Sequence, residues 1–160
     1  DKNEESWKAL EKLYKDGRVK SIGVSNFKEH HLDDLLTEAE IVPMINQVEL
    51  HPQFPQEEIR KYCKEKGIVV EAWASLMQGQ IFDKEKVKRI AEKHGKTISQ
   101  IGIRWAVQIG VVTIPKSTHT QRIKDNLNVF DFELDNEDMI KMAELNTGVR
   151  IGKDPDKIDF

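Results

Sequence analysis

The chain has 160 residues, a length typical of one domain, and its 38% hydrophobic and 33% charged residues indicate a globular protein. The net charge of −3 and the pI near 6.0 argue against a general nucleic-acid or membrane-surface binder. No apolar run reaches the roughly 18 residues that a transmembrane helix needs. The single cysteine, Cys63, excludes a disulfide within the chain. We therefore expect a cytoplasmic protein with neither nucleic-acid nor membrane partners.

Patterns typical of helices and strands alternate along the chain. Apolar residues at helical spacing predict helices over 5–17, 26–40, 55–67, 84–95, 96–110, 120–130 and 135–146. Short runs rich in valine and isoleucine predict strands over 18–26, 43–50, 68–76 and 111–117. The tail, 147–160, has no regular pattern. Helix boundaries are indicated by capping boxes at Asn26–Glu29 and Thr97–Gln100, an Asp135 cap, and stops at Gly17 and Gly67.

A strand that is followed by a helix and then by another strand gives neighbouring strands that run parallel. Four such units fit either a small open α/β sheet or half of a (β/α)8 barrel. A complete barrel usually needs about 250 residues, which is more than this chain supplies.

Polar or aromatic residues lie near the carboxyl end of every predicted strand. Folds of this class build their sites at that edge. The alternative is that these residues only cap the helices that follow. The residues are Ser25 and Asn26; Asn46, Gln47 and Glu49; Trp73, Ala74 and Ser75; and Lys116, Ser117 and Thr118.

The last strand-to-helix connection, "VVTIPKSTHTQR" at 111–122, has the chemistry of an anion site. We expect Thr118–Thr120 at a helix N-terminus, where free N–H groups and the helix dipole favour a negative ligand. Lys116 and Arg122 add two cations, and the planar guanidinium suits bidentate phosphate contact. Phosphate is the natural ligand, although either cation alone is more simply an ordinary surface charge. Neither G-x-G-x-x-G nor a P-loop occurs.

Four segments in order, "IGVSNF", "INQVELHP", "VVEAWASLMQG" and "TIPKSTHTQRIKDNL", resemble successive motifs of the aldo-keto reductases. The tail "RIGKDPDKIDF" is similar to that of the prokaryotic branch, near the diketogluconate reductases. The resemblance runs from about Trp7 to Phe160. It implies an α/β chain forming the C-terminal half of a (β/α)8 TIM barrel, so that residues 1–160 would be one partial domain without the N-terminal catalytic half.

The resemblance also implies a site for NADPH/NADP+. Ser25, Asn26 and Gln47 would bind the nicotinamide carboxamide, and Trp73 would stack on the nicotinamide ring. The pyrophosphate would be lined by Ala74, Ser75, Leu76, Gln78 and Gly79, and the 2′-phosphate held by Lys116, Ser117 and Arg122. Thr118 would belong to the same cofactor site. Asp125 and Asn126 would face the adenine. The family usually has proline at Ser75 and glycine at Met77, so we expect Met77 to crowd the pyrophosphate loop.

The family's catalytic set, an aspartate, a tyrosine, a lysine and a histidine, lies in the half that precedes this segment. No residue here matches it, so no catalytic residue is assigned, and we expect no metal cluster. Tyr14 and Tyr62 fit packing roles, Cys63 fits the core, and His51 matches a position outside the catalytic set. His30, His31, His94 and His119 fit solvated or capping roles.

The expected function is NADPH-dependent reduction of aldehydes or ketones by the parent reductase, with this chain inactive alone and partnered by the missing half or by another copy. The alternatives are a non-catalytic half-barrel that binds nucleotide or a partner chain, and an unrelated phosphate-binding domain. Turnover with an aldehyde in the presence of the other half separates the first from the second. Equal affinity for NADPH and free phosphate favours the third. The carbonyl substrate itself is not readable from the sequence.

Overall fold

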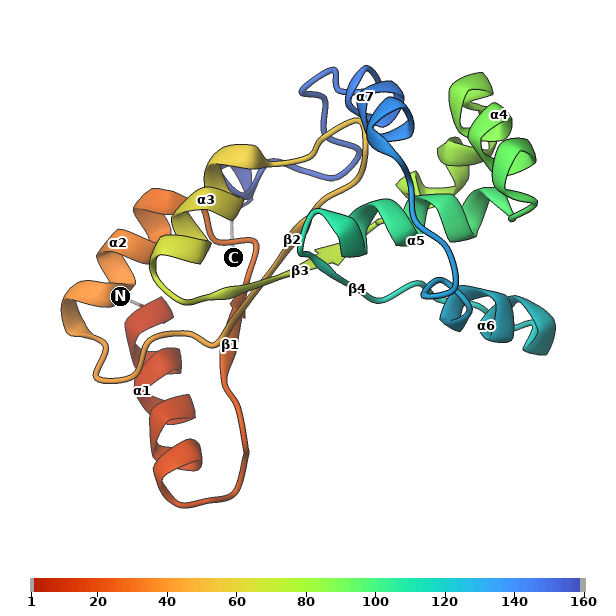
Figure 1. Cartoon of the computed structure of the whole chain (residues 1–160). Helices are drawn as coiled ribbons and strands as arrows, with labels where there is room; N and C mark the ends of the chain where they lie inside the picture. The colour runs from red at the N-terminus through yellow and green to blue at the C-terminus, as the bar shows by residue number, and fades with distance from the viewer. Residues whose placement is uncertain (1, 159–160) are drawn as a thin grey trace. The chain divides into compact units, whose positions relative to one another are not determined.

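A computed structural model of the chain describes residues 2–158 (Figure 1). The helices are α1 (Lys2–Lys15), α2 (Glu29–Glu38), α3 (Glu57–Glu65), α4 (Glu85–His94), α5 (Ile98–Gln108), α6 (Thr120–Leu127) and α7 (Asn136–Ala143). The strands are β1 (Gly23–Ser25), β2 (Ile45–Glu49), β3 (Val69–Trp73) and β4 (Val112–Thr113). Two 3-10 helices complete the order: η1 (Met77–Asp83) and η2 (Pro155–Lys157). No helix within residues 2–158 is long and apolar enough to span a bilayer.

The four strands form one sheet in the order β1-β2-β3-β4, which is also their order along the chain. β1 pairs with β2 in parallel, and Gly23, Val24 and Ser25 lie opposite Ile45, Asn46 and Gln47. Parallel strands alternating with helices confirm the predicted α/β class and are consistent with half of a (β/α)8 barrel. The strands are shorter than predicted, β4 most of all, because only two of the seven expected residues are in a strand.

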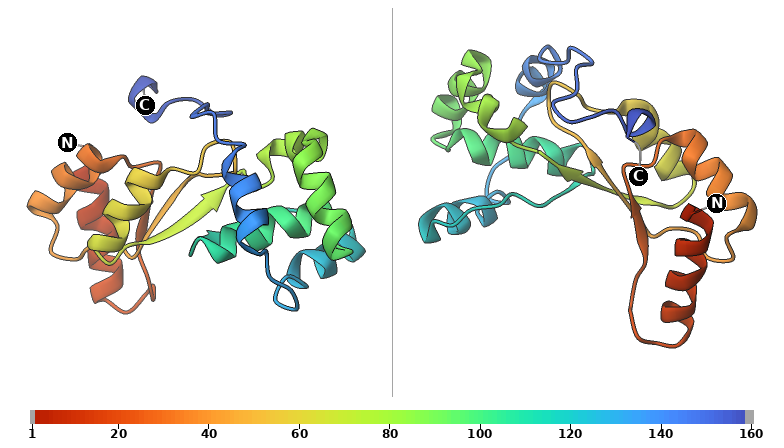
Figure 2. Two further views of the ribbon diagram at one scale, coloured as in Figure 1. Left: turned by 45° about the horizontal axis from the view of Figure 1, so that its top comes forward. Right: turned by 180° about the vertical axis from the view of Figure 1, so that it is seen from behind.

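The chain divides into two compact units. The first comprises Asp1–Val48, Gln56–Glu71 and Pro155–Phe160, and the second comprises Glu49–Pro55 and Ala72–Asp154. In the first unit α1 packs beside α2 in both further views (Figure 2). Its core contains Trp7, Ile22 and Leu35, and the Trp7 indole Nε1 donates to the Ile41 carbonyl at 3.1 Å.

In the second unit α5 packs against α4, α6 and η1, and α4 also contacts α7 (Figure 2). Helix α5 is buried along most of its length, from Gln100 to Ala106. The Thr97 hydroxyl accepts from the Gln100 amide, and the Asp135 carboxylate accepts from the Asp138 amide, so the capping box predicted at Thr97 and the cap predicted at Asp135 are both confirmed.

The predicted capping box at Asn26 is wrong. Helix α2 begins after Lys28, and the Lys28 amide donates to Nδ1 of His31 at 3.1 Å. Asn26 has a left-handed φ of 59°, and its amide donates to the Gln47 carbonyl at 2.8 Å, so it ends the strand. The stops predicted at Gly17 and Gly67 are confirmed, because α1 and α3 both end just before a glycine of positive φ.

Candidate functional site

A cavity of about 700 Å³ lies in the second unit, beside the loop that follows β3 and the start of α6. Its walls bring together two segments that are some forty residues apart in the sequence. Most of the predicted cofactor residues line it, namely Ala74, Ser75, Leu76, Gln78, Gly79, Lys116, Ser117, Arg122, Asp125 and Asn126. Phe82, Thr97, Ser99, Ile114 and Pro115 also line it and were not predicted.

The loop after β3 has an unusual backbone. Ala74, Met77 and Gln78 all have positive φ, at 55°, 56° and 51°. Left-handed conformation costs a non-glycine residue about 1–2 kcal/mol. Backbone strain of this kind persists only where the surrounding structure holds it in place, and it is common at binding sites. The strained backbone therefore supports a binding role for the loop in the cavity wall.

Met77 does not crowd the cavity, contrary to expectation. Its side chain is fully buried in the protein and is not among the lining residues. Ser75 is also buried, and its hydroxyl accepts from the Thr113 hydroxyl at 2.8 Å. This bond joins the loop after β3 to β4, on the two sides of the cavity.

Two cations at the cavity have no acidic partner. Within residues 2–158 neither Lys116 nor Arg122 has a carboxylate oxygen within 4.0 Å. The acidic lining residue Asp125 accepts a hydrogen bond from Gln121 at 2.9 Å. Unpaired positive charge on a concave surface attracts an anionic ligand. Lys116 and Arg122 are therefore available to bind a phosphate group.

The start of α6 differs in detail from the prediction. The helix begins at Thr120, its N-cap is His119, and the His119 amide donates to the Ser117 hydroxyl at 3.1 Å. Thr118 is exposed and does not line the cavity. Ser117 therefore organises the turn as well as lining the wall.

The predicted carboxamide-binding residues lie at the end of β1 and in the middle of β2, in the first unit. The Ser25 hydroxyl donates to the Gln47 carbonyl at 3.1 Å, and the Asn26 amide Nδ2 donates to the Ser25 hydroxyl at 3.2 Å. Gln47 Nε2 donates to Glu71 Oε1 at 2.6 Å, which orients the amide and directs its Nε2 group toward β3. The three predicted residues thus form one hydrogen-bonded group.

Two residues that hold this group in place, Asn46 and Glu71, were not recognised in that role from the sequence. Asn46 is fully buried; its Nδ2 donates to the Phe27 carbonyl at 2.8 Å, and its Oδ1 accepts from the Phe27 amide at 3.4 Å. Asn46 thereby holds the turn after β1, and Glu71 holds Gln47. A buried amide inside a β-branched strand was the available signal for Asn46. No local signal marked Glu71, because its partner lies on the neighbouring strand.

Trp73 is the last residue of β3, and it belongs to the second unit. Its indole is half-buried, and the tail residue Gly152 lies directly against it. The benzo ring of Trp73 is therefore bordered by the tail.

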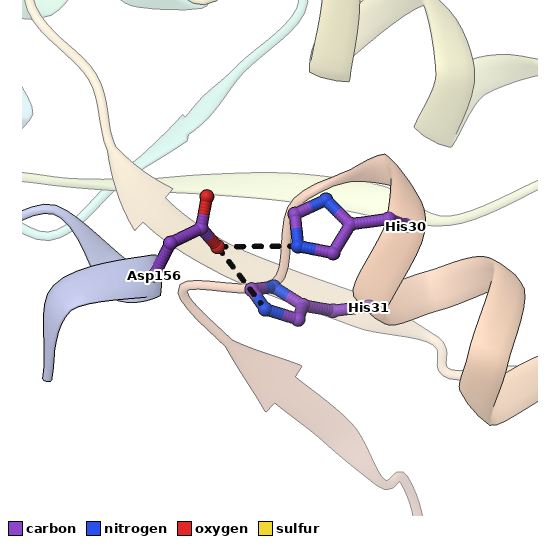
Figure 3. Close-up of side chains that lie close together, drawn as sticks. All are labelled: His30, His31 and Asp156. Carbon is purple, nitrogen blue, oxygen red and sulfur yellow. Dashed lines mark hydrogen bonds and ion pairs between the residues drawn. The ribbon is translucent and has the colours of Figure 1, made fainter. Parts of the chain in front are cut away.

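His30, His31 and Asp156 converge in the first unit, where the two imidazoles approach one carboxylate oxygen (Figure 3). The Nε2 atoms lie 3.1 and 3.3 Å from Asp156 Oδ1, and Lys28 Nζ lies 2.5 Å from Oδ2. Because His31 Nδ1 accepts the Lys28 amide, its proton is on Nε2 and points at Asp156. A metal ligand must be deprotonated at the coordinating atom. These contacts are those of a hydrogen-bonded cluster, with Lys28 supplying the positive charge, that holds η2 on the first turn of α2.

The two tyrosines have structural environments. Tyr14 packs against the core of the first unit. The Tyr62 hydroxyl donates to Asp33, and burial together with that carboxylate raises the pKa of Tyr62 to about 12. Cys63 is buried, as expected, and burial raises the pKa of its thiol. Neither tyrosine lines the cavity.

Comparison with known proteins gives one consistent family. The profile described as "Aldo/keto reductase family" matches residues 1–147. The chain is 56% identical over 160 residues to glyoxal reductase of Bacillus subtilis (strain 168), and 43% identical over 155 residues to methylglyoxal reductase DkgA of Escherichia coli (strain K12). The two matches extend over 100% and 96% of this chain, but over only 58% and 56% of the relatives' own lengths.

A solved structure agrees with the sequence relatives. A crystal structure of a Gox0644 variant in complex with NADPH superposes with a TM-score of 0.94 at 43% identity, covering 98% of this chain and 58% of that one. The chain thus spans a little over half the length of the proteins it matches. With the family profile matching 147 of its residues, the chain belongs to the aldo/keto reductase family.

Proposed function

We propose that this chain supplies most of the NADPH site of a reductase that converts aldehydes or ketones to alcohols. One observation carries the proposal: the unpaired Lys116 and Arg122 line the same cavity as the strained loop 74–79. A phosphorylated dinucleotide needs a cationic pocket for its 2′-phosphate and a narrow loop for its pyrophosphate. When bound, NADPH supplies the hydride for carbonyl reduction.

The residues of this chain would bind the parts of NADPH as follows. Lys116, Ser117 and Arg122 would bind the 2′-phosphate, and the loop Ala74–Gly79 would line the pyrophosphate. Asp125 and Asn126 would face the adenine, Trp73 would pack on the nicotinamide, and Ser25, Asn26 and Gln47 would bind its carboxamide. Relatives named for glyoxal and methylglyoxal support small 2-oxoaldehydes as the substrate class.

We assign no catalytic residue within this chain. Tyr14 packs against the core of the first unit, and Tyr62 does not suit proton donation to a carbonyl oxygen near neutral pH, since burial and Asp33 raise its pKa to about 12. Reduction therefore requires residues from the remainder of the family's length, on the same or another chain. The single buried cysteine suits a reducing compartment, and we place the protein in the cytoplasm.

The test is selectivity between NADPH and NADH, measured by fluorescence titration of the purified chain. The wild-type chain should prefer NADPH. Arg122→Ala should weaken NADPH binding about tenfold or more, since a hydrogen bond to a charged group contributes about 1.5–3 kcal/mol, and should leave NADH binding unchanged. Lys124→Ala is the matched control, because Lys124 is on α6 but does not line the cavity. Equal affinity of the wild-type chain for both nucleotides would contradict the proposal.

A further inference from the structure

A buried carboxylate lies at the end of β2 without an obvious purpose in the sequence. Glu49 is 0% exposed. Burying a charge is costly unless hydrogen bonds and opposite charges compensate it. The compensation comes from distant parts of the chain: the Ile151 amide donates to Oε1 at 2.5 Å, and the Gly152 amide lies 3.2 Å from both carboxylate oxygens. Glu49 therefore binds the backbone of the C-terminal segment.

His51 completes this arrangement from the same loop. Its Nε2 lies 3.0 Å from Glu49 Oε1, and its buried Nδ1 has no hydrogen-bond partner among the described residues. The ring proton is therefore on Nε2, where it donates to Glu49. Burial lowers the pKa of His51, so the ring is a neutral donor at physiological pH.

The positive charge comes from the tail itself. Arg150 Nη1 lies 3.6 Å from Glu49 Oε2, and the guanidinium packs over the Phe54 ring at 4.6 Å. A further backbone bond, from the Thr147 amide to the Gln53 carbonyl at 3.0 Å, fixes the start of the same segment. The loop Glu49–Pro55 thus holds the tail at several points.

The held segment touches Trp73. A Cβ built on Gly152 would lie 2.4 Å from Cη2 of Trp73 and 3.1 Å from Glu49 Oε2. Real Cβ atoms do not approach that closely, so any side chain at 152 would displace the segment or the indole. The tail backbone at Gly152 therefore lies against both the Glu49 carboxylate and the Trp73 ring.

We propose that Glu49 is a positioning residue that fixes Arg150–Gly152 as a strap against the Trp73 indole, and that this strap sets the affinity for the nicotinamide end of the cofactor. The inference rests on the proposed function. A strap that holds the indole in one orientation removes an ordering cost from binding. It should leave the 2′-phosphate end of the cofactor unaffected, because Lys116 and Arg122 take no part in it.

Two measurements on the whole chain test the proposal. Amide hydrogen exchange at Ile151 and Gly152 reports the strap directly. Affinities for NADPH and for 2′,5′-ADP, which lacks nicotinamide, separate the two ends of the ligand. In Glu49→Gln we expect exchange at both amides to rise and NADPH affinity to fall about tenfold, the equivalent of one good hydrogen bond, with 2′,5′-ADP affinity unchanged. Glu144→Gln, at an exposed ion pair with Lys86, is the matched control.

Gly152→Ala is the second variant, because it leaves the Glu49 carboxylate in the chain and places a methyl group between the tail and the Trp73 indole. It should give the same NADPH-specific loss. Slow exchange in Glu49→Gln, or equal weakening of both ligands, would overturn the strap. If the wild-type chain fails to bind NADPH while its two amides are protected and become exposed in Glu49→Gln, the proposed function is overturned and the anchoring contact stands.

Discussion

The Thr113 hydroxyl donates to the Ser75 hydroxyl at 2.8 Å, and so ties β4 to the strained loop after β3. Ser75 is 4% exposed, so its hydroxyl is removed from water. Because Thr113 directly precedes the lining segment Ile114–Ser117, the bond connects the binding loop to the segment that carries Lys116.

We predict that this bond is measurable by a double-mutant cycle. Ser75→Ala should destabilise the chain by about 1–2 kcal/mol, because it leaves the Thr113 donor without its partner. Thr113→Val should have a similar effect. The double variant should cost less than the sum by about 1 kcal/mol, since the two groups share one interaction. Urea denaturation of the four proteins gives the coupling, and strictly additive effects would show that the bond contributes nothing.

The second prediction concerns Met77, where the left-handed backbone lowers the stability of the fold and the buried side chain raises it. Met77→Gly removes strain of about 1–2 kcal/mol but deletes a fully buried side chain worth about 2–5 kcal/mol. The lost burial energy exceeds the relieved strain, so we expect the Met77→Gly variant to be less stable than wild type. Gln78→Gly is the control: its φ is 51° but its side chain is exposed, so the same change should stabilise by up to about 1 kcal/mol. Thermal unfolding of both variants distinguishes them, and a Met77→Gly protein more stable than wild type would contradict this balance.

These examples also show what the sequence predicted and what it did not. Helix limits followed from local signals, such as Thr97 with Gln100 and Asp135, because caps join residues a few positions apart. The box at Asn26 failed because a contact with the neighbouring strand, to Gln47, replaced the local one. The 3-10 helix η1 was missed because its backbone is held by packing of the buried Met77 and Ile81.

The site divides in the same way. The cationic segment 116–122 was recognisable because its residues are adjacent in the sequence, and the structure places Lys116, Ser117 and Arg122 at one cavity. The anchoring by Glu49 was not predictable, since Ile151 lies 102 residues further along the chain. Cofactor contacts assigned from the resemblance stay predictions until a bound nucleotide tests them.

The third prediction is a loss of stability in mild acid. Burial lowers the pKa of His51 and of His31 below 6.5, with the neighbouring His30 adding to the effect at His31. As pH falls below 6.5 the unfolded chain takes up protons at these positions before the folded chain does. Stability present above pH 6.5 is therefore lost as pH falls toward the folded pKa values, by up to about 1.4 kcal/mol per pH unit for each histidine.

Denaturation midpoints at pH 7.5 and pH 5.5, values chosen roughly one unit either side of the ordinary histidine pKa, measure this slope. His51→Gln keeps an N–H donor toward Glu49, and His31→Gln keeps an acceptor for the Lys28 amide, so each removes one titration while retaining the bond. Each variant should show a smaller difference between the two pH values than wild type. An unchanged slope in both would assign the acid sensitivity to other groups.

The last prediction concerns an apolar cavity of about 520 Å³ between β4, α5 and α6. Leu127 and Phe130 at its rim are 72% and 73% exposed, and β4 presents only two residues to the sheet. Exposed apolar surface of this kind drives association. We expect the isolated chain to self-associate through this surface. Leu127→Gln combined with Phe130→Gln should shift the light-scattering mass toward the monomer. Ile140→Gln, 61% exposed on α7 but outside the cavity, should not. A wild-type chain that remains monomeric at high concentration would contradict this prediction, because the apolar rim would then be stable in water without a partner.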